Sequence, residues 1–233
     1  MDETDAKPPE QVESAAPVTP PLEPPVDDKV YQARGKIADL SQWQGEIDWP
    51  VAARELDLCI LRAQYGAERA DERYKEYAAG CEDHGIPYAA YSYCTFKDEA
   101  SARAETQAFV ERIKGTKPVF LALDLEPGGV EPENIREAVS AYIAELKAQG
   151  VKRVAVYLDP NNYKIYNVDT AKADLVWLPS YGSNNGEPET KPAYDCDLWQ
   201  YTTNGLLGGV RGRVSLNKLM DESRMAWLRG EDA

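Results

Sequence analysis

Two carboxylates at the end of an apolar run are the residues whose spacing points most directly to chemistry. Residues 119–126 read Val-Phe-Leu-Ala-Leu-Asp-Leu-Glu, so Asp124 and Glu126 stand one residue apart, just before Pro127. Side chains at positions i and i+2 of a strand point to the same side, and the two acids should therefore converge at its carboxyl end. A neighbouring anion and partial burial both raise a carboxyl pKa, which lets one of the pair keep its proton near neutral pH and serve as a general acid.

Asp-x-Glu alone is a weak motif, and these acids could instead mark the strand's exit to solvent or bind a structural cation. Polar and aromatic side chains at the ends of other apolar runs favour the catalytic interpretation. They are Asp39, Arg62, Gln64, Tyr91, Tyr93, Tyr157, Tyr181 and Gln200. Aromatic rings stack on sugar rings while their polar edges bond hydroxyl groups, so these tyrosines suit a glycan cleft together with Trp43, Trp177 and Trp199. Any one of these aromatic residues, taken alone, is as often part of a hydrophobic core as part of a binding site.

Composition narrows the chemistry further. His84 is the only histidine in 233 residues, which excludes a His-rich zinc site and leaves catalysis mainly to carboxylates. The net charge of −14 and the lack of Lys/Arg clusters argue against a nucleic-acid partner. Because no run of about 18 apolar residues and no signal peptide is recognisable, we expect no membrane contact from this chain. The four cysteines form no CxxC pair, so free thiols are favoured over a disulfide.

Eight short apolar runs, rich in β-branched and aromatic residues, are predicted to form the strands that carry these side chains. They lie near 36–41, 58–65, 87–94, 118–126, 153–159, 175–181, 196–202 and 212–217. Helical stretches follow the first five runs. Their periodicity is clearest at 98–113 and 132–149, where Pro132 suits a first turn and Gly150 a helix stop. The pattern predicts an α/β fold, a single irregular β/α barrel of about eight strands with fewer than eight helices.

The last strands are predicted to depart from a regular barrel. Segments 182–195 and 203–211 are rich in Gly and polar residues and show no helical periodicity. Parallel neighbours require a long crossover, whereas antiparallel neighbours can be joined by short loops. We therefore expect antiparallel pairing among the later strands.

The first 35 residues differ in composition from the rest of the chain. They are rich in Pro, Glu, Asp and Val, contain three Pro-Pro pairs and have almost no aromatic residue, so they cannot bury a core. We interpret residues 1–35 as a disordered acidic tether and residues 36–233 as the catalytic barrel. The tether is either a spacer that holds the barrel away from an anchor or partner, which we favour, or an inert segment.

Short matches in a fixed order carry a resemblance to a known family. They are Asp39-Leu40-Ser41 with Gln44-Gly45 and Ile47-Asp48-Trp49, Arg62-Ala63 with Gly66, Gly85-Ile86-Pro87 with Tyr91-Ser92-Tyr93, Leu123-Asp124-Leu125-Glu126, Trp177-Leu178, and Leu198-Trp199-Gln200-Tyr201-Thr202. From about Lys36 to Leu219 the chain resembles the family 25 glycoside hydrolases, the lysozymes of bacterial peptidoglycan. The resemblance implies an irregular β/α barrel that hydrolyses the β-1,4 bond between N-acetylmuramic acid and N-acetylglucosamine, without a metal or organic cofactor.

The resemblance also implies roles for individual residues. Glu126 would be the general acid that protonates the leaving oxygen. Asp124 would assist through the substrate's 2-acetamido group or the oxocarbenium-like centre, and Asp39 would line the same cleft. The side chains expected to bind substrate are Arg62, Tyr91, Tyr93, Tyr157, Tyr181, Trp199, Gln200 and Ser215. These roles do not distinguish a substrate-assisted route from direct displacement or inversion. The implied protein is an extracellular or cell-wall-associated monomer whose partner is peptidoglycan.

One position departs from the family pattern. Where the family usually has Val-Asp-Leu-Asn in its last strand, this chain has Val214-Ser215-Leu216-Asn217. Losing an anion near Glu126 should lower the pKa of that acid and shift the pH profile downward. Because the proton donor and Asp124 remain, and a hydroxyl can replace one hydrogen bond, we expect an active enzyme.

Two other hypotheses remain open. The first is an inactive or impaired barrel that binds peptidoglycan, which the serine at position 215 favours. The second is a magnesium-dependent phosphoester hydrolase in which Asp39, Asp124 and Glu126 hold the cation. The acidic composition and the lack of a Gly-rich phosphate loop argue against the magnesium hypothesis.

Overall fold

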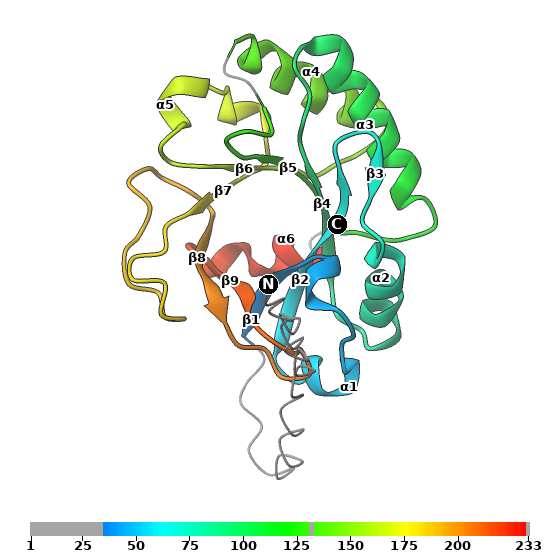
Figure 1. Ribbon diagram of the computed structural model, residues 1–233, viewed down its shortest axis with the longest axis vertical. Helices are drawn as coiled ribbons and strands as arrows, with labels where there is room; N and C mark the ends of the chain where they lie inside the picture. The colour runs from blue at the N-terminus through cyan, green and yellow to red at the C-terminus, as the bar shows by residue number, and fades with distance from the viewer. Residues whose placement is uncertain (1–34, 131–132, 232–233) are drawn as a thin grey trace, which may run out of the picture. The chain divides into compact units, whose positions relative to one another are not determined.

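The computed structural model describes residues 35–130 and 133–231, and these residues contain nine strands in one sheet. The strands are β1 (Lys36–Leu40), β2 (Leu56–Tyr65), β3 (Arg69–Ala70), β4 (Tyr88–Tyr93), β5 (Leu121–Leu125), β6 (Val154–Leu158), β7 (Leu175–Pro179), β8 (Leu198–Gly205) and β9 (Val214–Leu219). Their order is β1-β9-β8-β7-β6-β5-β4-β2-β3, and β1 also pairs with β2. Eight strands therefore close into a barrel, with β3 outside the ring (Figure 1).

All eight predicted strands are present, and the irregular barrel with fewer helices than strands is confirmed. The helices are α1 (Trp49–Ala52), α2 (Tyr74–Asp83), α3 (Glu99–Ile113), α4 (Ile135–Ala148), α5 (Tyr163–Tyr166) and α6 (Met225–Arg229), with 3-10 turns η1 (Gln42–Gln44), η2 (Thr170–Lys172) and η3 (Glu222–Arg224). The two-residue strand β3 was not predicted. The tether predicted for residues 1–35 lies outside the described residues except for Gly35, and so stays a prediction.

The two long helices form where their sequence patterns predicted them, and they lie side by side outside the ring (Figure 1). Asp98 caps α3 by accepting a hydrogen bond from the Ser101 backbone N–H at 2.7 Å. Helix α4 begins at Ile135, and Pro132, expected in its first turn, lies outside the described residues. Gly150 follows the end of α4 with a φ of +88°, the left-handed conformation in which glycine stops a helix.

Strand direction changes at the last strand of the ring. Strands β1, β2, β4, β5, β6, β7 and β8 pair in parallel along the ring, whereas β9 is antiparallel to both β8 and β1. The expected antiparallel pairing is thus confirmed for the last strand. Strand β8 stays parallel to β7, because the long segment 180–197 makes the crossover without a helix.

Alternation along each strand creates two cores, one inside the barrel and one between the strands and the outer helices. On β5, Leu121, Leu123 and Leu125 pack in the outer core. Ala122, and Phe120 just before the strand, pack inside the barrel. Leu228 of α6 belongs to the interior core as well. Asp124 continues the interior row of Phe120 and Ala122, so the alternation turns its carboxyl group into the barrel.

The four cysteines are free thiols, and Cys59, Cys81 and Cys94 are buried. Within residues 35–130 and 133–231, no helix combines the length and the apolar character needed to span a membrane.

Candidate active site

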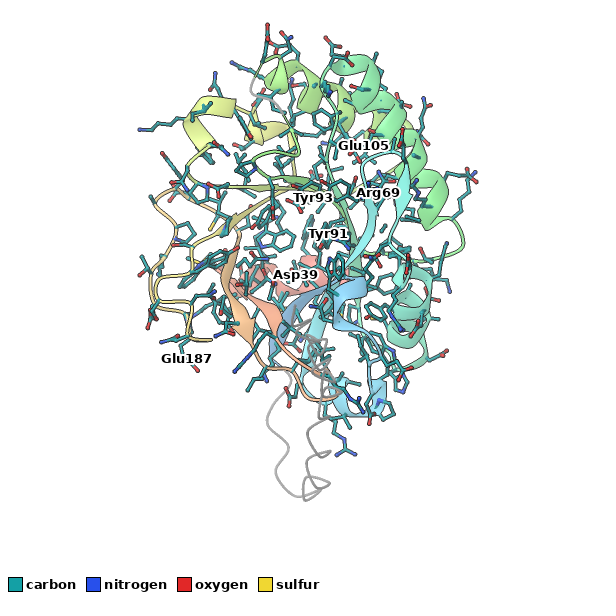
Figure 2. The ribbon with its side chains drawn as sticks, viewed as in Figure 1. Asp39, Arg69, Tyr91, Tyr93, Glu105 and Glu187 are labelled. Atoms are coloured by element: carbon teal, nitrogen blue, oxygen red, sulfur yellow. The ribbon has the colours of Figure 1, made fainter. Side chains whose placement is uncertain are left out.

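A cavity of about 310 Å³ opens at the carboxyl ends of the parallel strands. It is lined by Asp39, Leu40, Ser41, Trp43, Gln44, Arg62, Tyr91, Tyr93, Asp124, Glu126, Tyr157, Trp177, Tyr181, Gln200, Thr203 and Ser215. The cavity therefore contains every residue to which the family resemblance assigned a catalytic or substrate-binding role, except Trp199. Figure 2 shows Asp39, Tyr91 and Tyr93 pointing toward the centre of the ring from β1 and β4. The mouth of a β/α barrel is where loops and strand ends can assemble such a site.

Trp199 is the one predicted substrate-binding residue that does not line the cavity. Its neighbour Gln200 does, and consecutive strand residues point to opposite faces. The Trp199 ring is 2% exposed, packs edge-on against Tyr201, and donates from Nε1 to the Ser180 carbonyl at 2.8 Å. We therefore assign Trp199 a packing role on the far side of β8.

Gln64, also expected at the mouth, faces away from the cavity. The register of β2 against β4 shifts between Arg62 and Gln64, and this irregularity changes which side chains face inward. The Gln64 amide is buried, donates to the Ser92 hydroxyl at 2.9 Å, and accepts from Arg112 at 2.6 Å. Tyr65 takes the mouth-facing position instead, stacked on Tyr93.

The paired acids lie in different surroundings within the cavity. Asp124 is 7% exposed, and its Oδ1 has no hydrogen-bond partner among the described residues. Burial raises the pKa of Asp124 well above its ordinary value, the charges of Glu126 and Asp39 raise it further, and Arg62 opposes them. Glu126 is only partly buried, and desolvation, followed by the charges of Asp159 and Asp39, raises its pKa as well. Both acids are therefore displaced toward their protonated forms.

Asp39 is the most heavily hydrogen-bonded acid of the cavity. Its Oδ2 accepts from Gln200 Nε2 and from Asn217 Nδ2, each at 2.9 Å, and the nearby Ser215 side chain also lowers the pKa of this carboxyl group. Burial raises the pKa of Asp39, whereas these hydrogen bonds stabilise the charged form and lower it. Ser215 stands directly opposite Asp39 in the antiparallel register of β9 and β1.

The amide of Gln200 connects Asp39 to two aromatic side chains. Its Oε1 accepts from the Tyr181 hydroxyl at 2.6 Å and from the Tyr157 hydroxyl at 3.0 Å, while its Nε2 donates to Asp39. Tyr157 also packs edge-on against Trp177 at 4.8 Å between ring centroids. These contacts fix the rings before any ligand binds, which reduces the entropy cost of binding.

Two residues that orient the site were not predicted as site residues. Asn217 holds Asp39 and accepts from Trp177 Nε1 at 2.8 Å. Asp71 binds Arg62 through a 2.9 Å ion pair and accepts from the Gln42 backbone N–H at 3.0 Å, which ties the η1 turn to the site. Asn217 stands two residues after Ser215 on the same strand, so the sequence spacing alone indicates that both side chains point to the same face.

The η1 turn carries an aromatic side chain at the rim of the cavity. Trp43 is 76% exposed and lines the cavity, so its ring is free to contact a ligand. Trp177, in contrast, is 2% exposed and forms part of the interior core. Among the described residues, no group of three or more His, Cys, Asp or Glu side chains is arranged to hold a metal ion.

The fold and the cavity define an irregular β/α-barrel protein with buried carboxyl groups and aromatic rings at its mouth. The model of glycosyl hydrolases family 25 matches residues 38–210, and the chain belongs to this family.

Comparison with known proteins supports the same assignment. The chain is 25% identical over 197 residues to Lysozyme M1 of Streptomyces globisporus, covering 77% of this chain. It is 26% identical over 191 residues to the autolytic lysozyme of Clostridium acetobutylicum, covering 80% of this chain. The matched regions span only 66% and 56% of those relatives' lengths. The catalytic domain of endolysin ply40 from Listeria monocytogenes bacteriophage P40 superposes with a TM-score of 0.79 at 28% identity, covering 85% of this chain and 98% of that domain.

The raised pKa of Asp124 predicts a cost to stability that depends on pH. The native state binds this proton more tightly than the unfolded state, so the contribution of Asp124 to stability is present below its ordinary pKa of 3.8 and is lost as pH rises through the native pKa. Each pKa unit corresponds to about 1.4 kcal/mol. Urea denaturation should therefore show Asp124→Asn gaining stability relative to the parent as pH rises from about 4 to 7.

Asp83→Asn, at an exposed position near the end of α2, is the matched control and should follow the parent at every pH. An Asp124→Asn midpoint that stays at a constant offset from the parent across this range would show that the native carboxyl group is not displaced from ordinary titration.

Proposed function

We propose that this protein is a peptidoglycan hydrolase that cleaves the β-1,4 bond between N-acetylmuramic acid and N-acetylglucosamine. The observation that carries this proposal is the placement of Asp124 and Glu126 at one strand end, inside a cavity that raises both pKa values. Family membership and the similarity to two lysozymes support the choice of substrate. The protein would act outside the cell or at the cell wall, where this polymer lies.

Glu126 is the proposed general acid. It is less buried than Asp124, so its carboxyl group remains accessible to a substrate in the cavity. A raised pKa makes the protonated form of Glu126, which a general acid needs, more populated at a given pH than in an ordinary glutamate. As the bond from C1 to the leaving oxygen breaks, the Glu126 proton passes to that oxygen, and the carboxylate left behind can later take a proton from water.

Asp124 is the proposed assisting group. Its Oδ1 is a buried acceptor without a partner among the described residues, and such an atom is costly unless a ligand satisfies it. The N–H of the substrate's 2-acetamido group is a donor of the required kind. That hydrogen bond would hold the acetamido carbonyl oxygen toward C1, which supports a substrate-assisted route in which this oxygen bonds C1 as the leaving group departs.

The remaining cavity residues fit sugar binding. Tyr91, Tyr93, Tyr157 and Tyr181 line the walls, and Trp43 offers an exposed ring at the rim. Such rings stack on the apolar faces of sugars, and the Tyr157 and Tyr181 hydroxyl groups, held by Gln200, present fixed hydrogen-bond partners.

Glu126→Gln should lower the rate of peptidoglycan digestion by about 10² to 10⁴, because the amide keeps the shape of the side chain but has no carboxyl proton to give. Fragments would be reduced with borohydride, and mass spectrometry would identify the new reducing end. Reduced muramic acid from the parent is the expected product. Glu137→Gln, an exposed acid on α4, is the control and should digest at the parent's rate. Reduced glucosamine ends, or a Glu126→Gln variant as active as the parent, would contradict the assignment.

A second candidate function is peptidoglycan binding without efficient cleavage. The observation that favours it is Ser215, which places a neutral hydroxyl opposite Asp39 where the family usually has a carboxylate. In this chain, however, Ser215 lies beside Asp39, whose charged form it favours, and Asp124 and Glu126 both line the cavity. We therefore favour hydrolysis by a site that carries one negative charge fewer than the usual site of the family.

Ser215→Asp tests the electrostatic consequence of this difference. A second carboxylate opposite Asp39 adds negative charge to the cavity, disfavours ionisation of the other acids, and so should raise the pKa of the general acid. The alkaline limb of the pH profile should move up by about one pH unit, whereas the neutral variant Ser215→Asn should leave it in place. An unchanged or lowered limb would contradict the charge argument. Digestion by Ser215→Asp but not by the parent would instead support the binding function for the natural chain.

A further inference from the structure

A row of side chains leads from the unpredicted strand β3 to the acid pair. Arg69 of β3 is the register partner of Tyr65 on β2, and Tyr65 is in turn the partner of Tyr93 on β4. Tyr93 is the partner of Asp124 on β5. Register partners on neighbouring strands lie side by side, so these four residues form one continuous row along the barrel mouth.

The middle of this row is an aromatic platform that adjoins the cavity. The Tyr65 and Tyr93 rings are stacked, with centroids 4.4 Å apart and an interplanar angle of 7°. Tyr93 lines the cavity, whereas Tyr65 is 39% exposed and lies beyond it. Figure 2 shows Arg69 and Tyr93 on the same side of the ring, where β3 runs beside β2. The Arg69 guanidinium lies over the Tyr65 ring at 5.6 Å from its centroid.

Arg69 differs from the other arginine of this region in its partners. Arg62 is ion-paired with Asp71 inside the cavity wall. The exposed Arg69 has no carboxylate partner within residues 35–130 and 133–231, and its contact there is with the Tyr65 ring. A guanidinium has five N–H donors and binds a carboxylate through two parallel hydrogen bonds. At the edge of a cavity whose own ionisable groups are mostly acids, Arg69 is suited to an anionic part of the ligand.

We propose that Arg69, supported by the Tyr65 and Tyr93 platform, binds a carboxylate of the peptide attached to the muramic acid and so selects substrate with intact peptides. This inference rests on the proposed function, because it assigns a contact in the same site. Three strand spacings of about 4.8 Å separate Arg69 from Asp124, or about 14 Å. An extended peptide advances about 3.4 Å per residue, so roughly four residues cover this distance.

The test compares glycan strands that carry their peptides with strands from which an amidase has removed them. The parent should prefer intact strands, and Arg69→Gln should lower the ratio of kcat/KM for intact to peptide-free strands about tenfold, mainly through KM, since one charge-assisted contact is lost. Arg69→Lys keeps the charge and should retain part of the preference. Arg136→Gln, at an exposed position on α4, is the control and should keep the parent's ratio. An Arg69→Gln ratio equal to the parent's would overturn the proposal.

A binding measurement separates failure of this inference from failure of the proposed function. Calorimetric titration with a soluble muramyl peptide would compare Glu126→Gln with the double variant Glu126→Gln/Arg69→Gln. About tenfold weaker binding by the double variant, with equal binding of the peptide-free sugar, would support the contact even if the parent cleaves neither strand. Equal affinity of both proteins for the muramyl peptide would overturn it even if the parent proves to be a muramidase.

Discussion

Removing carboxyl groups from water is the physical constraint on which the site depends. Phe120, Ala122 and Asp124 form one row along β5 that faces the barrel interior. The alternation that builds the core therefore also places an acid inside the barrel. Burial disfavours the charged form, and the nearby charges of Asp39 and Glu126 add to the effect. Arg62 offsets only part of it. The barrel therefore holds acids that retain protons more strongly than acids in water. A general acid that cleaves a glycosidic bond needs this property.

The irregular end of the barrel contributes to this environment. Because β9 runs antiparallel to β1, its amino-terminal residues reach the mouth, and Ser215 meets Asp39 there. Asn217, two residues later, donates to Asp39 and also accepts from Trp177. A parallel last strand would present its carboxyl end at the mouth instead. The reversal thus surrounds Asp39 with neutral donors, which stabilise its charged form, whereas Oδ1 of Asp124 has no donor among the described residues.

Much of the architecture follows from patterns that are local in the sequence. Apolar runs located the eight strands, helical periodicity located α3 and α4, and the spacing of Asp124 and Glu126 placed both acids in the cavity. These features depend only on alternation and on the geometry of one element. The short matches that resemble family 25 agree with the family model over residues 38–210.

Features that depend on register between strands were missed. The irregularity after Arg62 turns Gln64 outward and Tyr65 toward the mouth, and nothing in the residue types marks that shift. Trp199 and Gln200 are neighbours on one strand. Apolar and polar residues do not alternate regularly along this strand, so its sequence does not indicate which of the two faces inward. Asp71 and Asn217 act through contacts with Arg62 and Asp39, which lie on other segments of the chain. The residue types at strand ends could not predict these contacts.

The measurement that tests this account most directly is a pH titration of the side-chain carboxyl carbons by NMR, with resonances assigned by Asp124→Asn and Glu126→Gln. The account predicts that both acids titrate above their ordinary values of 3.8 and 4.5, and that each substitution changes the titration of the remaining acid. Two independent titrations at ordinary values in the folded protein would contradict it, because the cavity would then not hold the proton that the proposed reaction needs.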